Sequence, residues 1–251
     1  MNDGKITPDD VAGKLRGPEG SKVGVTIQRN DQIMDFILTR EPITITSVKS
    51  YISDSMPDVG KVGVVKIKNF SGTTAQVVAD AVKDLKSKGA TALILDLRGN
   101  PGGLLPGGVA TASLFLDSNK PVVFVVDKNG VVDSQATLES GIDLDSSLIV
   151  FTNGNTASAA EVVTAALKEN GRARVVGDSS SQSTFGKGII QTIRQLSYDN
   201  GGLAVTVARY ETPLHHDINK QGVPVDYSIS ACTETDAVKC IPKSAFQKPA
   251  S

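Results

Sequence analysis

A regular alternation of strand-like and helix-like segments from about residue 60 onward most constrains the fold of this chain. Strand-like apolar runs occupy residues 61–70, 90–99, 121–127, 146–154 and 172–177, and segments with helical spacing occupy residues 72–88, 107–116 and 157–170. The run ATALILDLRG has the continuous apolar character of a strand that is buried on both faces. Strands that alternate with helices in this way favour an α/β fold with a mainly parallel central sheet.

Residues 1–42 have a different pattern, which predicts one helix followed by a hairpin. Thr7 stands where a helix N-cap is expected, and Pro8 follows at the first helical position. Strand-like runs at residues 22–28 and 34–40 then flank a turn. A helix and a hairpin bury too little apolar surface to be stable alone, so we expect this unit either to pack on the remainder or to be half of a domain.

Composition excludes several functional classes. The chain has 251 residues, 39% of them hydrophobic, which is enough for a substantial core. A net charge of -1 provides no electrostatic surface for nucleic acid or for an anionic membrane. No apolar run approaches the roughly 20 residues that span a bilayer, and the N-terminal MNDGKITPDD is too polar for a signal peptide. His215 and His216 are the only histidines, and we predict neither a metal site nor a cofactor.

Cys232 and Cys240 are the only cysteines, and they admit two interpretations. They are close enough in sequence to close a small disulfide loop in an oxidising compartment, or they are two unrelated thiols. Their spacing in CTETDAVKC is not that of a metal-binding CxxC.

A serine lies where an apolar run turns into an alanine-rich helix, in TNGNTASAAE at residues 152–161. With Thr156 as the expected cap, Ser158 and Ala159 fall in the first helical turn, where backbone N–H groups lack intrahelical partners. Such a site stabilises the oxyanion of a tetrahedral intermediate, with the Ala159 N–H as the natural donor. The motif by itself leaves two interpretations open: Ser158 is a nucleophile, or the small residues merely let the helix pack closely.

A glycine-rich turn follows the buried strand, in DLRGNPGG at residues 96–103. The N–H groups of Gly102 and Gly103 could supply a second oxyanion donor, because glycine allows positive φ and close approach of the backbone. An ordinary strand-to-helix turn is the alternative. A phosphate-binding loop is unsupported, because neither GxGxxG nor GxxxxGK[ST] occurs.

The segment STFGKGIIQ, residues 183–191, contains the candidate base. Lys187 can accept a proton near neutral pH only where an apolar pocket removes it from water. In a strand, Lys187 and Gln191 share one face, so Gln191 could orient the amine. A lysine in an exposed turn is the alternative. A serine–histidine–aspartate triad would need His215 or His216 and fits this sequence less well than a serine–lysine pair.

Together and in this order, DLRGNPGG, TASAAE and TFGKGIIQ resemble the motifs of the C-terminal processing, or tail-specific, proteases. The similarity covers most of the chain. KLRGPEGSKVGVTIQR and LTREPITITSV look like the second half of that family's PDZ domain and its junction with the protease core, and ARYETPLHHDINKQGVPVD resembles its closing segment. The chain looks most like the photosynthetic branch, which trims a photosystem II reaction-centre precursor.

The resemblance implies a domain organisation. Residues 1–42 would be the C-terminal half of a PDZ domain, which leaves out that domain's carboxylate-binding loop. Residues 43–240 would be the protease core, with a ClpP/crotonase-like spiral fold. Residues 241–251 would be a flexible tail.

The resemblance also implies roles for particular residues. Ser158 would be the nucleophile, Lys187 the general base and Gln191 its positioning partner. The oxyanion hole would consist of the backbone N–H of Ala159 and that of Gly102 or Gly103. The substrate would be the C-terminal tail of a protein, membrane-bound or not, in a thylakoid lumen or a bacterial periplasm, and no cofactor is implied.

Two departures from the family pattern leave other functions open. The segment DSSSQS, residues 178–183, is a few residues longer than its counterpart in relatives and precedes Lys187. The PDZ resemblance covers only half of that domain. A catalytically impaired scaffold or binding protein is therefore one alternative, and an enzyme that acts on acyl-CoA with a similar core is another.

Overall fold

The computed structural model describes residues 6–41, 47–196 and 201–247, which divide into two compact units, Met1–Thr46 and Ser47–Ser251. The domain boundary predicted after residue 42 falls next to residues 42–46, which lie outside the described residues. Within the described ranges, no helix is long and apolar enough to cross a membrane.

The first unit consists of the predicted helix and hairpin. Helix α1 (Pro8–Leu15) is followed by the antiparallel strands β1 (Lys22–Arg29) and β2 (Gln32–Thr39). Thr7 caps the helix as expected, and its N–H donates to the Asp10 carboxylate at 2.9 Å, which completes a capping box. These elements confirm the local prediction, and their identity as part of a PDZ domain stays a prediction.

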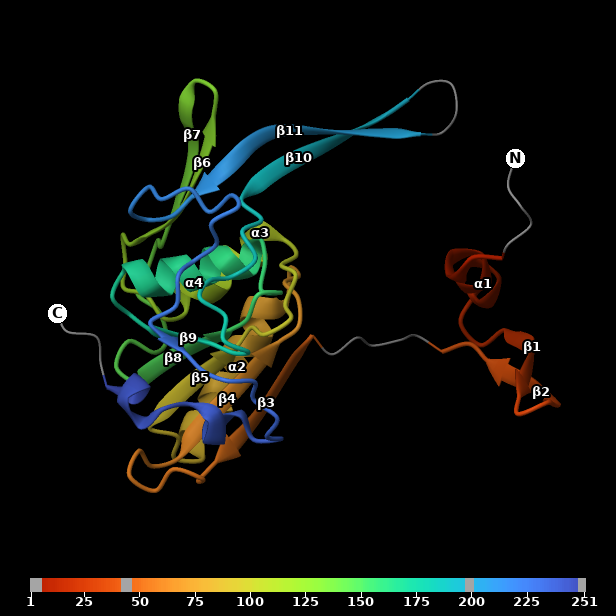
Figure 1. Cartoon of the computed structure of the whole chain (residues 1–251), viewed down its shortest axis with the longest axis horizontal. Helices are drawn as coiled ribbons and strands as arrows, with labels where there is room; N and C mark the ends of the chain where they lie inside the picture. The colour runs from red at the N-terminus through yellow and green to blue at the C-terminus, as the bar shows by residue number, and fades with distance from the viewer. Residues whose placement is uncertain (1–5, 42–46, 197–200, 248–251) are drawn as a thin grey trace. The chain divides into compact units, whose positions relative to one another are not determined.

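The second unit is built on a six-stranded sheet with the order β12-β9-β8-β5-β4-β3. Strands β9, β8, β5, β4 and β3 of this sheet are labelled in Figure 1. Its strands are β3 (Val48–Ser53), β4 (Val62–Ile67), β5 (Ala92–Asp96), β8 (Ser147–Thr152), β9 (Arg174–Gly177) and β12 (Tyr227–Ser228). All neighbouring strands pair in parallel except β3 and β4. The mainly parallel sheet is therefore confirmed, while the finer description as a ClpP/crotonase-like spiral stays a prediction.

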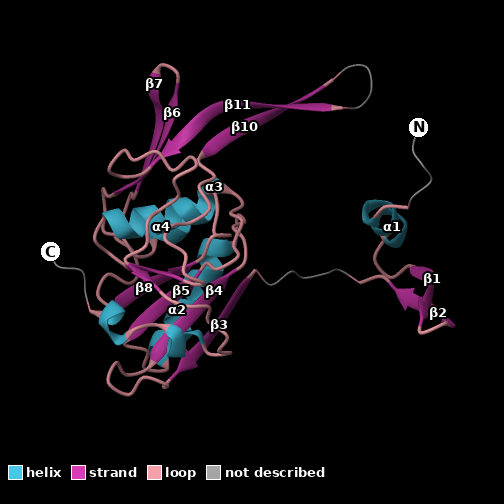
Figure 2. Cartoon of the chain, viewed as in Figure 1, coloured by secondary structure: helices cyan, strands magenta, loops and turns pink. Residues whose placement is uncertain are grey.

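Side chains along the central strands alternate between two cores. On β5, Leu93 and Leu95 belong to the larger hydrophobic cluster, whereas Ala92 and Ile94 belong to the smaller one on the other face. The larger cluster includes buried side chains of helices α2 (Thr74–Ser87), α3 (Leu105–Ser113) and α4 (Ala159–Glu169). Figure 2 shows these helices in cyan. A strand with both faces covered is apolar without interruption, which explains the sequence of residues 90–99.

A second, antiparallel sheet corrects one expectation from the sequence. It has the order β10-β11-β6-β7, with β6 (Pro121–Asp127), β7 (Gly130–Ala136), β10 (Ile189–Gln195) and β11 (Gly202–Glu211). Residues 121–127 form a strand as predicted, but outside the parallel sheet. The physical reason is the short turn to β7, which permits only an antiparallel neighbour. Strands β10 and β11 also pair with each other in antiparallel orientation.

The C-terminal residues correct a second expectation. Residues 241–247 do not form a loose tail, because Ile241, Ala245 and Phe246 are buried in the smaller cluster. Ile241 directly follows the 3-10 helix Ala237–Cys240, and Ala245 and Phe246 belong to the 3-10 helix Lys243–Phe246. Residues 248–251 lie outside the described residues.

Candidate active site

A buried asparagine holds the glycine-rich loop that follows β5. Asn100 has no exposed surface, and its side chain donates to the Ile67 carbonyl at 3.0 Å and accepts from the Gly102 N–H at 2.8 Å. Its backbone carbonyl accepts the Ala157 N–H at 2.9 Å. Asn100 thus joins the end of β4, its own loop and the segment that precedes Ser158.

The two glycines of this loop adopt conformations that few other residues tolerate. Gly102 has φ 103°, and an added Cβ would lie 2.7 Å from the Ser158 Cβ. Gly103 has φ 133°, and a Cβ there would lie 2.2 Å from the Phe70 carbonyl oxygen. The loop backbone therefore passes directly beside Ser158, which only glycine permits.

Ser158 lies at the N-terminus of α4 in a strained conformation. The sequence predicted Thr156 as the cap, but Ser158 itself is the N-cap residue, with φ 57° and ψ −122°. Thr156 is not the cap because its buried hydroxyl donates to the Leu97 carbonyl at 2.8 Å. A non-glycine residue at positive φ carries strain of roughly 1–3 kcal/mol, which the surrounding contacts must offset, and such strain concentrates at functional sites.

Two backbone N–H groups near Ser158 are available to a ligand. Among the described residues, no acceptor is found for the N–H of Ala159 or of Gly103. The Gly102 N–H, in contrast, already donates to Asn100. Of the glycine pair proposed from the sequence, Gly103 therefore has the donor that remains free. The Ala159 N–H also benefits from the positive end of the α4 dipole.

A buried carboxylate, which the sequence interpretation missed, joins the serine and lysine segments. Glu161 has no exposed surface, and its Oε2 accepts the N–H groups of Ser158 and Lys187, each at 2.8 Å. Its Oε1 accepts the Thr184 hydroxyl and the Gly186 N–H, each at 2.6 Å. These four donors account for both carboxylate oxygens. The spacing Ser-x-x-Glu at residues 158–161 is that of a capping box. This spacing was the signal in the sequence that could have identified Ser158 as the N-cap and Glu161 as its partner.

Lys187 and Gln191 lie close to this network in sequence, and both are exposed. The apolar burial on which the base role of Lys187 depends is therefore not present in this structure. Strand β10 begins only at Ile189, and its register shifts between Ile190 and Gln191. Because of this irregularity, simple strand alternation does not place Lys187 and Gln191 on one face, and the role of Gln191 stays a prediction.

The chain has relatives among known proteins. The sequence profile of Peptidase family S41 matches residues 61–229. A carboxyl-terminal-processing protease of Picosynechococcus sp. is 38% identical over 220 residues, which is 87% of this chain and 51% of that protein. A carboxyl-terminal-processing protease of Synechocystis sp. is 41% identical over 223 residues, covering 88% of this chain and 50% of that protein. The chain spans about half the length of these curated relatives.

The chain is also similar to solved protease structures. A photosystem II D1 C-terminal processing protease aligns with a TM-score of 0.68 and 34% identity, over 95% of this chain and 63% of that one. An S41 protease from Bacteroides fragilis aligns with a TM-score of 0.59 at 17% identity, over 82% of this chain and 58% of that one, which is evidence for the fold alone.

Proposed function

Because this chain belongs to peptidase family S41, we propose that it is a serine endopeptidase that cleaves protein chains near their C-termini. The observation that carries the proposal is the conformation of Ser158. This serine has positive φ at a helix N-terminus and lies beside the glycine-rich loop, and the N–H groups of Ala159 and Gly103 have no acceptor among the described residues. An acyl-transfer site requires this combination of an accessible hydroxyl and oriented donors.

In the proposed reaction, Lys187 in its neutral form removes the proton of the Ser158 hydroxyl. The Oγ atom attacks the carbonyl carbon of the scissile peptide, and the oxyanion accepts hydrogen bonds from the N–H groups of Ala159 and Gly103. The intermediate collapses as the protonated lysine gives its proton to the leaving amine. Water then enters, Lys187 accepts one of its protons, and hydrolysis of the acyl-enzyme restores Ser158. Gln191 is proposed to orient the lysine amine.

Glu161 supports this assignment through the backbone. Its carboxylate accepts the N–H groups of both Ser158 and Lys187, so the two segments that carry the reacting groups have one common anchor. Because positions shifted by about 1 Å can lower a rate about 100-fold, a shared anchor of this kind matters for alignment. Glu161 is a positioning residue in this proposal and does not contact the substrate.

The exposed side chain of Lys187 suggests when it becomes a base. We propose that a substrate chain lying over Ser158 also covers the lysine amine and excludes water from it, which favours the neutral form. Activity would then depend on substrate binding as well as on the fixed geometry of the site.

The substrate class and the compartment are part of the proposal. The substrate is an extended protein C-terminus, because relatives are named for C-terminal processing. The compartment is a thylakoid lumen or a bacterial periplasm. A relative of Arabidopsis thaliana, 40% identical over 229 residues, or 89% of this chain and 43% of that protein, is named as chloroplastic. The disulfide between Cys232 and Cys240 also fits an oxidising compartment.

The test is cleavage of an unstructured polypeptide with an apolar C-terminus by the chain, beside Ser158→Ala and Lys187→Ala, from pH 6 to pH 10. We expect cleavage by the parent chain only, with a rate that rises with pH as the base loses its proton. A fluorophosphonate should label the parent chain at Ser158. A chain that neither cleaves nor is labelled would instead be a catalytically impaired scaffold or binding relative, a role that the exposure of Lys187 would favour.

A further inference from the structure

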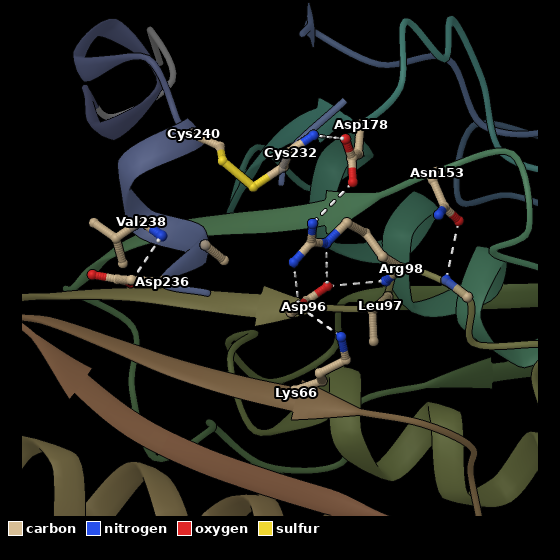
Figure 3. A network of polar contacts seen from close by, with 12 residues as sticks. Lys66, Asp96, Leu97, Arg98, Asn153, Asp178, Cys232, Asp236, Val238 and Cys240 are labelled. Carbon is tan, nitrogen blue, oxygen red and sulfur yellow. Dashed lines mark hydrogen bonds and ion pairs between the residues drawn. A yellow bond between two sulfur atoms is a disulfide. The ribbon is translucent and has the colours of Figure 1, made fainter. Parts of the chain in front are cut away.

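One carboxylate connects the C-terminal disulfide to the loop beside Ser158 (Figure 3). Asp178 follows β9, and its Oδ2 accepts a hydrogen bond from Nη1 of Arg98 at 2.9 Å. Its other oxygen, Oδ1, accepts the N–H of Cys232 at 2.8 Å. Asp178 is mostly buried, so both contacts form where water competes little.

Arg98 belongs to the loop that runs beside the candidate active site. Its Nε and Nη2 atoms each lie 2.9 Å from an oxygen of Asp96, and its guanidinium lies 4.0 Å above the Phe151 ring. The loop that carries Arg98 continues through Asn100 to Gly102, beside Ser158. Burial alone would lower the pKa of Arg98, but its hydrogen bonds and charge interactions with the two aspartates raise it above its usual value. The guanidinium therefore stays charged and needs both carboxylates.

The disulfide holds Cys232, the residue whose N–H donates to Asp178, in place. Cys232 and Cys240 are bonded to each other, which decides between the two readings that the sequence left open. Cys240 ends the 3-10 helix Ala237–Cys240, whose Ala237 and Val238 are buried in the smaller core. The bond therefore attaches Cys232, and with it the N–H that Asp178 accepts, to a rigid part of the fold.

The loop between Asp178 and Lys187 packs against the same segment. Ser179 and Ser180 have φ values of 58° and 57°, which L-residues rarely adopt. The Ser180 N–H donates to the Ile229 carbonyl at 2.6 Å, three residues before Cys232. The longer DSSSQS segment thus follows the chain that leads into the disulfide, on the path from Asp178 to the candidate base.

From these contacts we propose that Asp178 is a positioning residue through which the Cys232–Cys240 disulfide holds the Arg98 loop in place, so that reduction of this disulfide slows the reaction. The effect on rate rests on the proposed function, whereas the coupling between the disulfide and the loop does not. Reduction frees the Cys232 segment, its N–H leaves Asp178, and the Asp178 carboxylate then reorients and holds Arg98 less firmly.

The chemistry requires a dithiol as reductant, such as dithiothreitol. One of its thiolates attacks a cysteine Sγ, so that the Sγ–Sγ bond breaks, a mixed disulfide with the reductant forms, and the other cysteine leaves as a thiolate. The second thiol of the reductant, as its thiolate, then attacks the reductant sulfur of the mixed disulfide and displaces the remaining cysteine as a thiolate. Two electrons and two protons pass to the protein, which then holds two cysteine thiols, while the reductant becomes a cyclic disulfide. Both cysteines are half-buried, so a small dithiol has access. The chain contains no other cysteine, so any thiol-dependent change originates here.

The first experiment measures coupling without reference to activity. Amide hydrogen exchange of the full chain is compared before and after dithiothreitol, with attention to residues 97–104. In the oxidised chain the Arg98 N–H donates to Asp96 and the Gly99 N–H to Asn153. We expect several-fold faster exchange at these amides after reduction, while amides of α2 stay unchanged. Equal exchange in both states would overturn the proposal, whether or not the chain cleaves any substrate.

The second experiment measures rates of polypeptide cleavage for the parent chain and for Asp178→Asn, each oxidised and reduced. We expect reduction, or the substitution alone, to lower kcat about 10-fold and to change KM less than about twofold, because the link acts on alignment and not on substrate contact. If the disulfide acts through Asp178, reduction of the Asp178→Asn variant should lower kcat by less than a further factor of about two. If the decreases in kcat caused by reduction and by Asp178→Asn multiply, the disulfide and Asp178 act independently, and the proposal is overturned.

Matched controls exclude a general loss of structure. Asp84→Asn removes a carboxylate from an exposed ion pair with Lys88 on α2, and its kcat should equal that of the parent chain. The double variant Cys232→Ser, Cys240→Ser should behave as the reduced parent chain and should not respond to dithiothreitol. If the oxidised parent chain cleaves nothing, the proposed function fails, and the exchange experiment still decides the coupling.

Discussion

Replacing Glu161 by glutamine tests the physical reasoning about the site most directly. The carboxylate accepts four hydrogen bonds, two at each oxygen, and is fully buried. Glutamine has nearly the same shape but only one acceptor oxygen, and its NH₂ group would face two donors. Whichever way the amide turns, two hydrogen bonds to a charged acceptor are lost, each worth about 1.5–3 kcal/mol. We therefore expect the free energy of unfolding to fall by about 3–6 kcal/mol.

The same substitution should lower the rate of cleavage by about 100-fold or more, because the Ser158 and Lys187 backbones lose their common anchor. Urea denaturation monitored by circular dichroism gives the stability, and single-turnover cleavage below the unfolding transition gives the rate. Glu139→Gln serves as the control, because Glu139 is exposed and its replacement should change either quantity little. A Glu161→Gln variant within 1 kcal/mol of the parent chain, with an unchanged rate, would refute the role assigned to this carboxylate.

Three further predictions follow from the same contacts. Gly102→Ala should abolish cleavage and lower the free energy of unfolding by roughly 2–4 kcal/mol. The reason is that alanine is strained at φ 103° and its Cβ would lie 2.7 Å from the Ser158 Cβ. A soluble variant with the melting temperature of the parent chain would contradict this prediction. Replacing both Cys232 and Cys240 by serine should lower the free energy of unfolding by about 2.5 kcal/mol, the value for a loop of roughly nine residues, as measured by urea denaturation. Burial raises the pKa of the Asp178 carboxyl, but hydrogen bonds from a guanidinium and from backbone N–H groups lower this pKa overall. The carboxylate therefore contributes its full stabilisation above the unfolded pKa of 3.8, and this contribution is lost as the pH falls through the lower folded pKa. The Asp178→Asn variant should therefore lose less free energy of unfolding than the parent chain as the pH falls below about 4, and an equal loss in both chains would count against this assignment.

The sequence alone determined the secondary structure of most of the chain. Helix α2 and strand β5 occur where periodicity predicted them, because the spacing of apolar residues depends on neighbours close in sequence. The continuous apolar run of β5 also predicted a sheet covered on both faces. The order of the three motifs predicted the family, to which the chain belongs.

Pairings between distant segments could not be obtained in this way. Residues 121–127 were identified as a strand, yet their pairing with β7 and β11 puts them in the second sheet. Phe246 was assigned to a loose tail, since a short segment with few apolar residues has no periodicity to reveal the core that covers it. For residues 121–127, the neighbouring strand β7 had not been predicted and the other partner, β11, is distant in sequence. The core that covers Phe246 also includes residues distant in sequence.

In the candidate site, too, some residues could be predicted from the sequence and others could not. The sequence identified Ser158 and the glycines from local requirements: a helix N-terminus and backbone that needs positive φ. It gave no role to Glu161 or Asp178, because a carboxylate looks alike in the sequence whether it faces solvent or is surrounded by donors. Only tertiary structure determines which N–H groups converge on a carboxylate. For Glu161 they come from segments more than 20 residues apart, and a hydrogen bond forms wherever folding brings donor and acceptor within about 3 Å.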